Sequence, residues 1–229
     1  MGYFFGDTGF LLLVLPAMAF ALWAQARVQG SFRRWSAVAT RAGRRGAEVA
    51  RDILDRAGLD DVKVERIPGN LSDHYDPRVR VLRLSETVFE SQSIAALGVA
   101  AHEAGHAIQH DTGYAPLAIR NSILPAARFG STLAWPLFLV GLIFSWGYLM
   151  DFGIVLFAAA VAFQVVTLPV EYNASRRALA VLEEGGYLAP QELGPARQVL
   201  SAAALTYLAA TALAIAQLLR LLILRSRRD

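Results

Sequence analysis

Residues Ile94 to Gln109 have the sequence IAALGVAAHEAGHAIQ, in which small and apolar residues surround three ionisable groups. This composition is typical of a buried helix. Inside it, His102, Glu103 and His106 match the pattern HExxH. Two histidines four positions apart lie one turn apart on the same helix face, so both imidazoles can bind one ion. Ionisable groups in such an apolar helix are costly unless a metal or a partner compensates them, which favours a metal site.

The cofactor and the general base are predicted from the same residues. The chain has no cysteine, so a metal site must use His, Asp or Glu ligands. We expect Zn²⁺ bound by His102 and His106, although the order of metal affinities alone leaves cobalt and manganese open. Glu103 can take a proton from zinc-bound water, whose pKa the metal lowers to about 7, and pass it to the leaving amine.

A third ligand is expected, because a catalytic zinc usually has three protein ligands and one open position. His110 extends the same helix, but it lies about 12 Å along the axis from His102 at about 1.5 Å per residue. Three side chains so spaced on an unbroken helix cannot all meet one ion. Glu171, which follows Pro169 at the end of an apolar block, is the other candidate. From the residues alone, Glu171 is equally well explained as a solvated residue at the membrane interface.

Apolar residues make up 55% of the 229 residues, and four apolar blocks approach the length of a membrane span. They cover about 9–26, 133–150, 152–170 and 202–224. This pattern predicts an integral membrane protein, mainly α-helical, with about four transmembrane helices. The middle two blocks are expected to form a hairpin whose turn lies around Asp151, and Pro169 is expected to end or kink the third block.

The polar part between the first two blocks predicts a helical, zincin-like catalytic region. A soluble helix is expected over Ala37–Ala57, and two alternating segments, VKVERI (62–67) and VRVLRL (79–84), predict a small β-hairpin or strand pair. The expected division of the chain is a membrane anchor (1–26), a catalytic region (27–130), a transmembrane hairpin (131–170), a third-ligand helix and loop (171–200), and a membrane helix with a basic tail (201–229).

The arginines predict the topology. Lys and Arg are dense between the first two blocks and recur at Arg176, Arg177 and Arg197, so both regions should face the cytoplasm. The basic tail (225–228) opposes this, because four spans would place it outside. Acidic residues interleave with the arginines, which indicates a solvated region facing a lipid bilayer and no nucleic-acid partner. Arg176 and Arg177 could bind a substrate carboxylate, but interface arginines more often face lipid phosphates.

The segment SDHYDP (72–77) connects the two predicted strands. Its His74 and Tyr75 are candidate catalytic residues, because positioned donors of this kind stabilise the oxyanion that develops in acyl transfer. Asp and Pro are also common in turns, so the segment could simply join the strands.

Three segments, GNLSDHYDPRVRVLRLS, GVAAHEAGHAIQH and PVEYNASRRAL, occur in this order among the apolar blocks. Together they resemble the YugP-type neutral zinc metallopeptidases of bacterial membranes, over about 67–182. That family resembles the HtpX and CAAX-prenyl-protease metallopeptidases, in which a glutamate on a later helix is the third zinc ligand; the resemblance implies this role for Glu171. Those relatives have an aspartate four residues later, where this chain has Ser175. Asn173 or Ser175 is left to orient a histidine.

We therefore expect a membrane-embedded zinc metallopeptidase of the bacterial inner membrane, acting on peptide bonds of membrane proteins or membrane-associated peptides, with its active site on the cytoplasmic side. A site-2-type intramembrane protease also uses HExxH, but its later span supplies an aspartate beside a glycine, where this chain has Glu171. A non-enzymatic zinc-binding scaffold would not need Glu103, and a metal transporter should carry several ionisable residues within its spans. The oligomeric state is not predicted.

Overall fold

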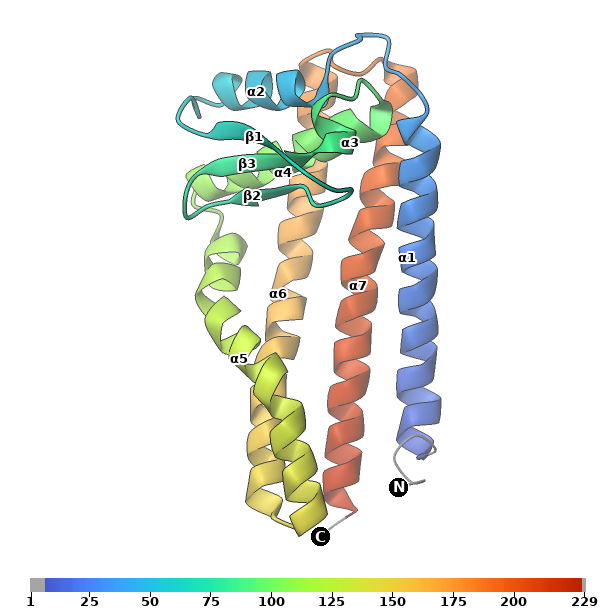
Figure 1. Cartoon of the computed structure of the whole chain (residues 1–229), viewed down its shortest axis with the longest axis vertical. Helices are drawn as coiled ribbons and strands as arrows, with labels where there is room; N and C mark the ends of the chain where they lie inside the picture. The colour runs from blue at the N-terminus through green and yellow to red at the C-terminus, as the bar shows by residue number, and fades with distance from the viewer. Residues whose placement is uncertain (1–6, 228–229) are drawn as a thin grey trace. The chain divides into compact units, whose positions relative to one another are not determined.

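The computed structural model describes residues 7–227 (Figure 1). The fold is mainly helical with one small sheet, which confirms the predicted fold class. Its helices are η1 (Phe10–Val14), α1 (Leu15–Ser36), α2 (Gly46–Arg56), α3 (Glu86–Phe89), α4 (Ile94–Asp111), α5 (Ala115–Phe144), α6 (Gly147–Glu184) and α7 (Pro190–Ser226), and its strands are β1 (Lys63–Ile67), β2 (His74–Asp76) and β3 (Val81–Ser85).

Four helical segments are long and apolar enough to cross a membrane, as predicted: Phe10–Ser36, Ala115–Phe144, Gly147–Glu184 and Pro190–Ser226. The chain divides into two compact units, each made of separate segments. Of the described residues, unit 1 comprises those up to Gln25, Ala118–Pro169 and those from Thr206 onward. Unit 2 comprises Ala26–Leu117 and Val170–Leu205.

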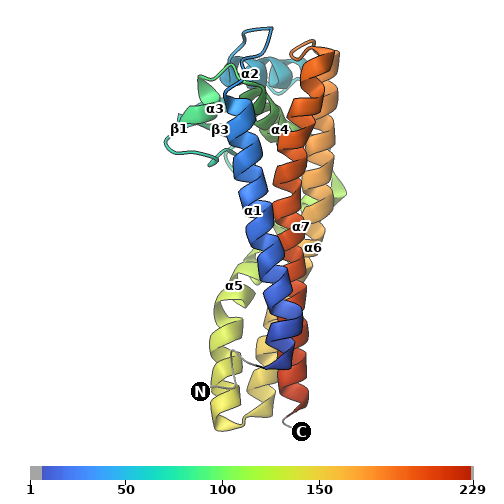
Figure 2. The ribbon, with the colours of Figure 1, turned by 90° about the vertical axis from the view of Figure 1, so that its right-hand side faces the viewer.

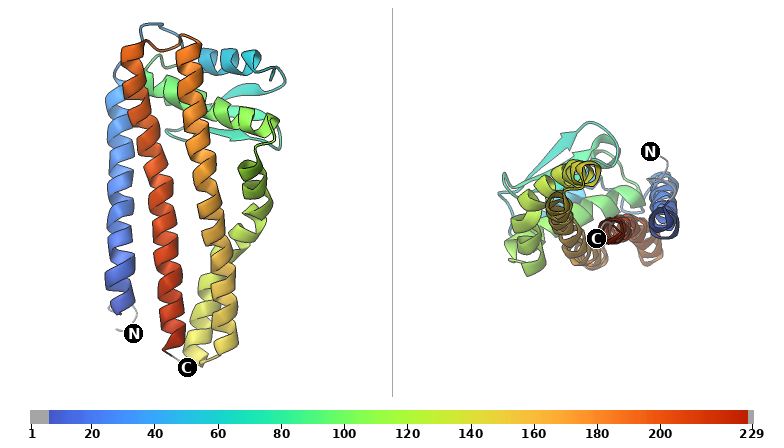
Figure 3. Two further views of the ribbon diagram at one scale, coloured as in Figure 1. Left: turned by 180° about the vertical axis from the view of Figure 1, so that it is seen from behind. Right: turned by 90° about the horizontal axis from the view of Figure 1, so that it is seen from below.

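Unit 1 is a bundle of apolar helices. Within it, α7 lies between α1 and α6, as both panels of Figure 3 show. In Figure 2, α1 lies in front of α7. Phe138, Met150, Ile154 and Leu221 form its buried cluster. A buried ion pair joins Arg220 of α7 to Asp7 at 2.9 Å, with side chains 3% and 6% exposed. Charges in an apolar bundle are expected to be paired in this way.

The hairpin between α5 and α6 turns at 145–146, so the turn predicted around Asp151 was placed too late. Ser145 has a φ of +56°, and the Trp146 N–H donates to the Gly141 carbonyl at 2.8 Å, as is usual where a helix ends. Apolar residues continue through this turn, so hydropathy alone does not reveal it. Asp151 lies inside α6 and accepts a hydrogen bond from Nε of Arg225 at 2.7 Å.

The sheet of unit 2 has the strand order β1-β3-β2. The two predicted strands exist as β1 and β3, but they pair in parallel, so of the two predicted arrangements the hairpin is wrong. The segment between them supplies β2, which pairs antiparallel to β3 at the sheet edge. A connection of about a dozen residues is long enough to return the chain for parallel pairing.

The core of unit 2 holds α4 in place. In Figure 1 and the left panel of Figure 3, α4 lies across one face of the sheet. Helix α2 packs against α4; it begins later than the expected Ala37, at Gly46, where the Arg45 N–H donates to the Glu48 carboxylate at 3.0 Å. The buried residues come mainly from α2, β3, α4 and α6, with others from α3 and α7, and include Val49, Ile53, Leu82, Leu84, Leu97, Ala100, Ala104 and Leu182.

Helix α6 does not end at Pro169; it continues to Glu184. Proline removes one backbone hydrogen bond, but the residues on both sides of Pro169 remain helical. Helices α4 and α6 pack closely at Gly105. A Cβ at this position would lie only 3.0 Å from the Ala174 carbonyl oxygen. Gly105, inside the HExxH pattern, therefore leaves room for the backbone of α6.

Candidate metal centre

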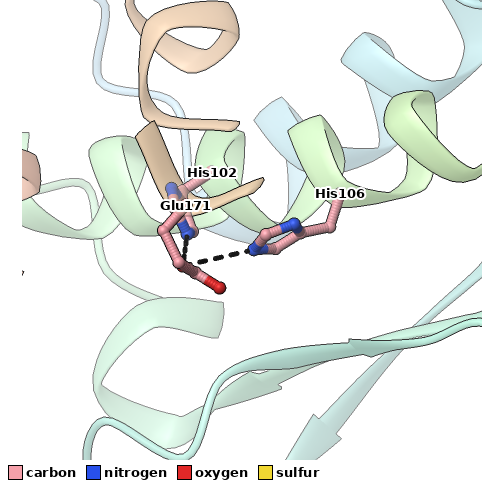
Figure 4. Close-up of side chains that lie close together, drawn as sticks. All are labelled: His102, His106 and Glu171. Atoms are coloured by element: carbon pink, nitrogen blue, oxygen red, sulfur yellow. Dashed lines mark hydrogen bonds and ion pairs between the residues drawn. The ribbon is translucent and has the colours of Figure 1, made fainter. Parts of the chain in front are cut away.

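Helices α4 and α6 bring His102, His106 and Glu171 together (Figure 4). Oε2 of Glu171 lies 3.3 Å from Nε2 of His102 and 3.6 Å from Nε2 of His106. One ligand atom from each residue lies within 4.8 Å of the other two. Glu171 is only 2% exposed. The structure thus gathers the three residues predicted as metal ligands from two helices distant in sequence.

Each imidazole has its other nitrogen bound to a neutral side chain. Nδ1 of His102 lies 3.2 Å from the Ser175 hydroxyl, and Nδ1 of His106 lies 2.9 Å from Oε1 of Gln109. These contacts turn both Nε2 atoms toward Glu171. Hydrogen bonds of this kind fix the ring orientation of metal-binding histidines.

The hydrogen bonds of the Gln109 side chain show which of its amide atoms is the nitrogen and which is the oxygen. Its Nε2 donates to the Val170 carbonyl at 2.8 Å and to Oδ1 of Asn173 at 2.9 Å, and that Oδ1 also accepts from Nε of Arg177 at 2.9 Å. Since the amide nitrogen is the donor, Oε1 must be the acceptor, and Nδ1 of His106 must carry the hydrogen. The lone pair of neutral His106 is then on Nε2, the nitrogen that faces Glu171.

The ligand atoms of the site are of the kind that bind a divalent metal. Lone pairs on nitrogen and carboxylate oxygen repel one another at this separation unless a proton or a cation lies between them. Burial alone would lower the pKa of His106, but the hydrogen bond and the charge of Glu171 raise that pKa above its usual value. Two imidazoles and a carboxylate are a ligand set typical of catalytic zinc. His102, His106 and Glu171 would hold the ion.

Glu103 is held by the edge of the sheet. Its side chain is on α4, the residue is 9% exposed, and Oε2 accepts a hydrogen bond from the Tyr75 backbone N–H at 3.1 Å. Tyr75 belongs to β2, whose other edge pairs with β3. The sheet therefore fixes one oxygen of the carboxylate that was predicted to be the base.

The other two predicted residues, His74 and Tyr75, form their side-chain hydrogen bonds within the described chain with residues other than the three predicted ligands. The Tyr75 hydroxyl lies 2.9 Å from Nδ1 of His110, so it forms its hydrogen bond with that imidazole. His74 is exposed; its Nδ1 lies 2.8 Å from the Ser72 carbonyl and its Nε2 lies 3.5 Å from Arg83. The oxyanion role proposed for His74 and Tyr75 remains a prediction.

Sequence reasoning missed Gln109. It is fully buried and bridges α4 to α6 through the contacts described above. The sequence does show a polar side chain three positions after His106, in a helix that is largely apolar. Because its partners on α6 are distant in sequence, the pattern alone does not show what it contacts. Of the two residues left open as histidine partners, Ser175 contacts His102 directly and Asn173 acts through Gln109.

Comparison with known proteins gives one family and one close relative. A family model described as "Putative neutral zinc metallopeptidase" matches residues 10–226. The chain is 47% identical over 211 residues to a protein of Bacillus subtilis (strain 168) named "Putative membrane protease YugP", covering 92% of this chain and 94% of the relative. No solved structure matches the chain.

Proposed function

Because the chain belongs to the neutral zinc metallopeptidase family, we propose that it is a membrane-bound zinc endopeptidase with His102, His106 and Glu171 as ligands and Glu103 as general base. The observation that carries the proposal is the convergence of the three ligand atoms within 4.8 Å, with both Nε2 atoms directed at Glu171.

The chemistry divides between the ion and the chain. Bound zinc would supply a Lewis acid that lowers the pKa of water and polarises the substrate carbonyl. Glu103 would accept the proton of the attacking water and transfer it to the leaving amine nitrogen as the peptide C–N bond breaks. The Tyr75 N–H holds Oε2 of Glu103, which leaves Oε1 for the proton. A fixed carboxylate needs little reorganisation during transfer, and that favours a catalytic role.

The proposed substrates are peptide bonds of membrane proteins or membrane-associated peptides. Support comes from the four apolar helices and from the membrane protease to which the chain is similar. A zinc-binding scaffold would use the same ligands without Glu103, and a site-2-type protease would use an aspartate where Glu171 lies.

Two variants test the function in detergent-purified full-length protein. The expected results are about one zinc per chain in the wild type and in Glu103→Gln, little zinc in Glu171→Ala, and casein cleavage by the wild type but by neither of these two variants. Gln191→Leu, an exposed residue of α7, is the matched control and should keep both properties. Zinc binding without Glu103-dependent cleavage would favour the scaffold, and absence of zinc would exclude both.

We also propose that unit 2 faces the cytoplasm at a bacterial inner membrane, as the distribution of Lys and Arg supports. The chain has no cysteine, so one introduced thiol reports one position. Lys63→Cys, at an exposed position of β1, should react with a membrane-impermeant maleimide in inverted vesicles but not in intact spheroplasts. The opposite pattern would place the active site outside.

A further inference from the structure

A groove of about 370 Å³ runs between α6 and α7 within unit 2. Its lining residues recur every three or four positions on each helix, so one face of each helix forms each wall. Leucines and alanines form the apolar part. The polar side chains are Tyr172, Ser175, Arg176 and Glu183 of α6, and Arg197 and Ser201 of α7.

Among the described residues, the two arginines of this groove have no ion-pair partner. Over residues 7–227, neither Arg176 nor Arg197 forms an ion pair or a hydrogen bond with another side chain, and both are exposed. Many other arginines of unit 2 are paired with carboxylates, as Arg44 is with Asp52 at 2.7 Å and Arg45 is with Glu90 at 2.8 Å. Two guanidinium groups that share a groove repel each other, so an anion between them is favoured. Their planar donor arrays match phosphate.

Both arginines lie at similar distances from the ends of the apolar runs. Arg176 is six residues after Val170, where one run ends, and Arg197 is five residues before Ala202, where the next begins. At about 1.5 Å per residue, both lie roughly 7–9 Å beyond those ends along their helices. The headgroup layer extends about 5–8 Å beyond the hydrocarbon, and long arginine side chains reach back toward it.

From these observations we propose that the groove binds the phosphate of an anionic phospholipid headgroup between Arg176 and Arg197. The Ser201 hydroxyl can donate a further hydrogen bond, and Tyr172 has the amphipathic ring that is enriched at membrane interfaces. Glu183 lies two turns from Arg176 and opposes the anion at the far end. Lipid binding needs no peptide hydrolysis, so the proposal goes beyond the proposed function.

The groove adjoins the candidate metal centre through one residue. Ser175 lines the groove, and its hydroxyl lies 3.2 Å from Nδ1 of His102. A substrate carboxylate could therefore also reach the arginines. The lipid is favoured because the two arginines lie at headgroup depth on neighbouring apolar helices, whereas nothing in their placement requires a bound peptide.

The test measures lipid retention by native mass spectrometry of the full-length protein in detergent. With phosphatidylglycerol, Arg176→Gln/Arg197→Gln should bind roughly thirtyfold more weakly than the wild type, since each arginine near a phosphate contributes about a fivefold effect. Lys63→Gln/Arg66→Gln removes the same charge from exposed positions of β1 and should bind normally. Glu183→Gln should bind more tightly, and phosphatidylcholine should bind weakly to all forms. Unchanged helix content and zinc content exclude misfolding of the groove variant.

Equal phosphatidylglycerol binding by the wild type and the groove variant would overturn the proposal. So would glycerol phosphate that displaces the lipid at equal concentration, because the site would then recognise the free anion. A third contrary result is unchanged lipid binding together with a raised KM only for peptides whose C-terminus is a free carboxylate, which would assign the groove to substrate. Glu103→Gln should bind lipid like the wild type, so loss of the proposed protease function leaves this test intact.

Discussion

Gln109 holds His106 by a hydrogen bond of 2.9 Å between its Oε1 and the imidazole Nδ1. The same amide donates to α6 at the Val170 carbonyl, so one buried side chain joins the histidine to the helix that carries Glu171. The distance between the predicted ligands therefore depends on a residue that binds no metal.

Replacing Gln109 should weaken zinc binding without removing a ligand. Gln109→Leu loses the contact with His106 and leaves the Val170 carbonyl without its side-chain donor, so zinc affinity should fall about 10–100-fold. Competition with a chromophoric chelator measures this. Gln191→Leu, on the exposed start of α7, serves as the control. Wild-type affinity in Gln109→Leu would show that the bond does not position His106.

Ser175 offers a graded test at the other histidine. Ser175→Ala removes the hydroxyl that contacts Nδ1 of His102 and should lower zinc affinity, whereas Ser175→Asp supplies a carboxylate and should match or exceed the wild type. Equilibrium competition for zinc at constant pH gives the order. An aspartate variant weaker than the alanine variant would contradict this account.

Tyr75 makes two separable contacts. Tyr75→Phe keeps the backbone N–H bond to Glu103 and loses only the hydroxyl contact with His110, so zinc content and most of kcat should remain. Tyr75→Pro lacks the N–H and should lower kcat sharply while zinc stays bound. Steady-state kinetics with zinc analysis distinguishes them. A fall of about 10²–10³ in kcat for Tyr75→Phe would instead support the hydroxyl as an oxyanion donor.

Gly105 and Gly98 lie on the same helix and should respond oppositely to alanine. A Cβ at Gly105 would lie 3.0 Å from a backbone oxygen of α6, so Gly105→Ala should destabilise the fold by about 1–3 kcal/mol and weaken zinc binding. A Cβ at Gly98 meets nothing within 4 Å, so Gly98→Ala should stabilise the helix by about 0.5–1 kcal/mol. Thermal unfolding measures both. Equal changes in stability for Gly105→Ala and Gly98→Ala would refute the idea that Gly105 is needed for the contact with α6.

Because of Asp52, we expect the folded state to lose stability in acid. Hydrogen bonds from Arg44 and Tyr187, which outweigh burial, hold the pKa of Asp52 at about 2, below its usual value of 3.8. The native state thus favours the ionised carboxylate, and this stabilisation is complete above about pH 4 and lost as the pH falls toward 2. The melting temperatures of wild type and Asp52→Asn should converge over that range. A difference that does not change with pH would contradict the assignment.

Local patterns predicted much of this structure, and long-range contacts account for what they missed. The spacing of His102 and His106 predicts a shared ion because four residues make about one helical turn. Glu171 needed family resemblance, since a carboxylate after an apolar run is equally typical of an interface. The pairing of β1 with β3 and the contacts of Gln109 depend on partners distant in sequence. No local periodicity encodes them.

The imidazoles of His102 and His106 form hydrogen bonds with a hydroxyl and an amide, neither of which carries charge. Carboxylate partners would push electron density into the rings and make the histidines more basic donors. With neutral partners, the rings carry less electron density than they would beside carboxylates. Such rings would donate less electron density to a bound zinc ion. The neutral partners of His102 and His106 therefore favour a zinc that polarises the substrate carbonyl more strongly.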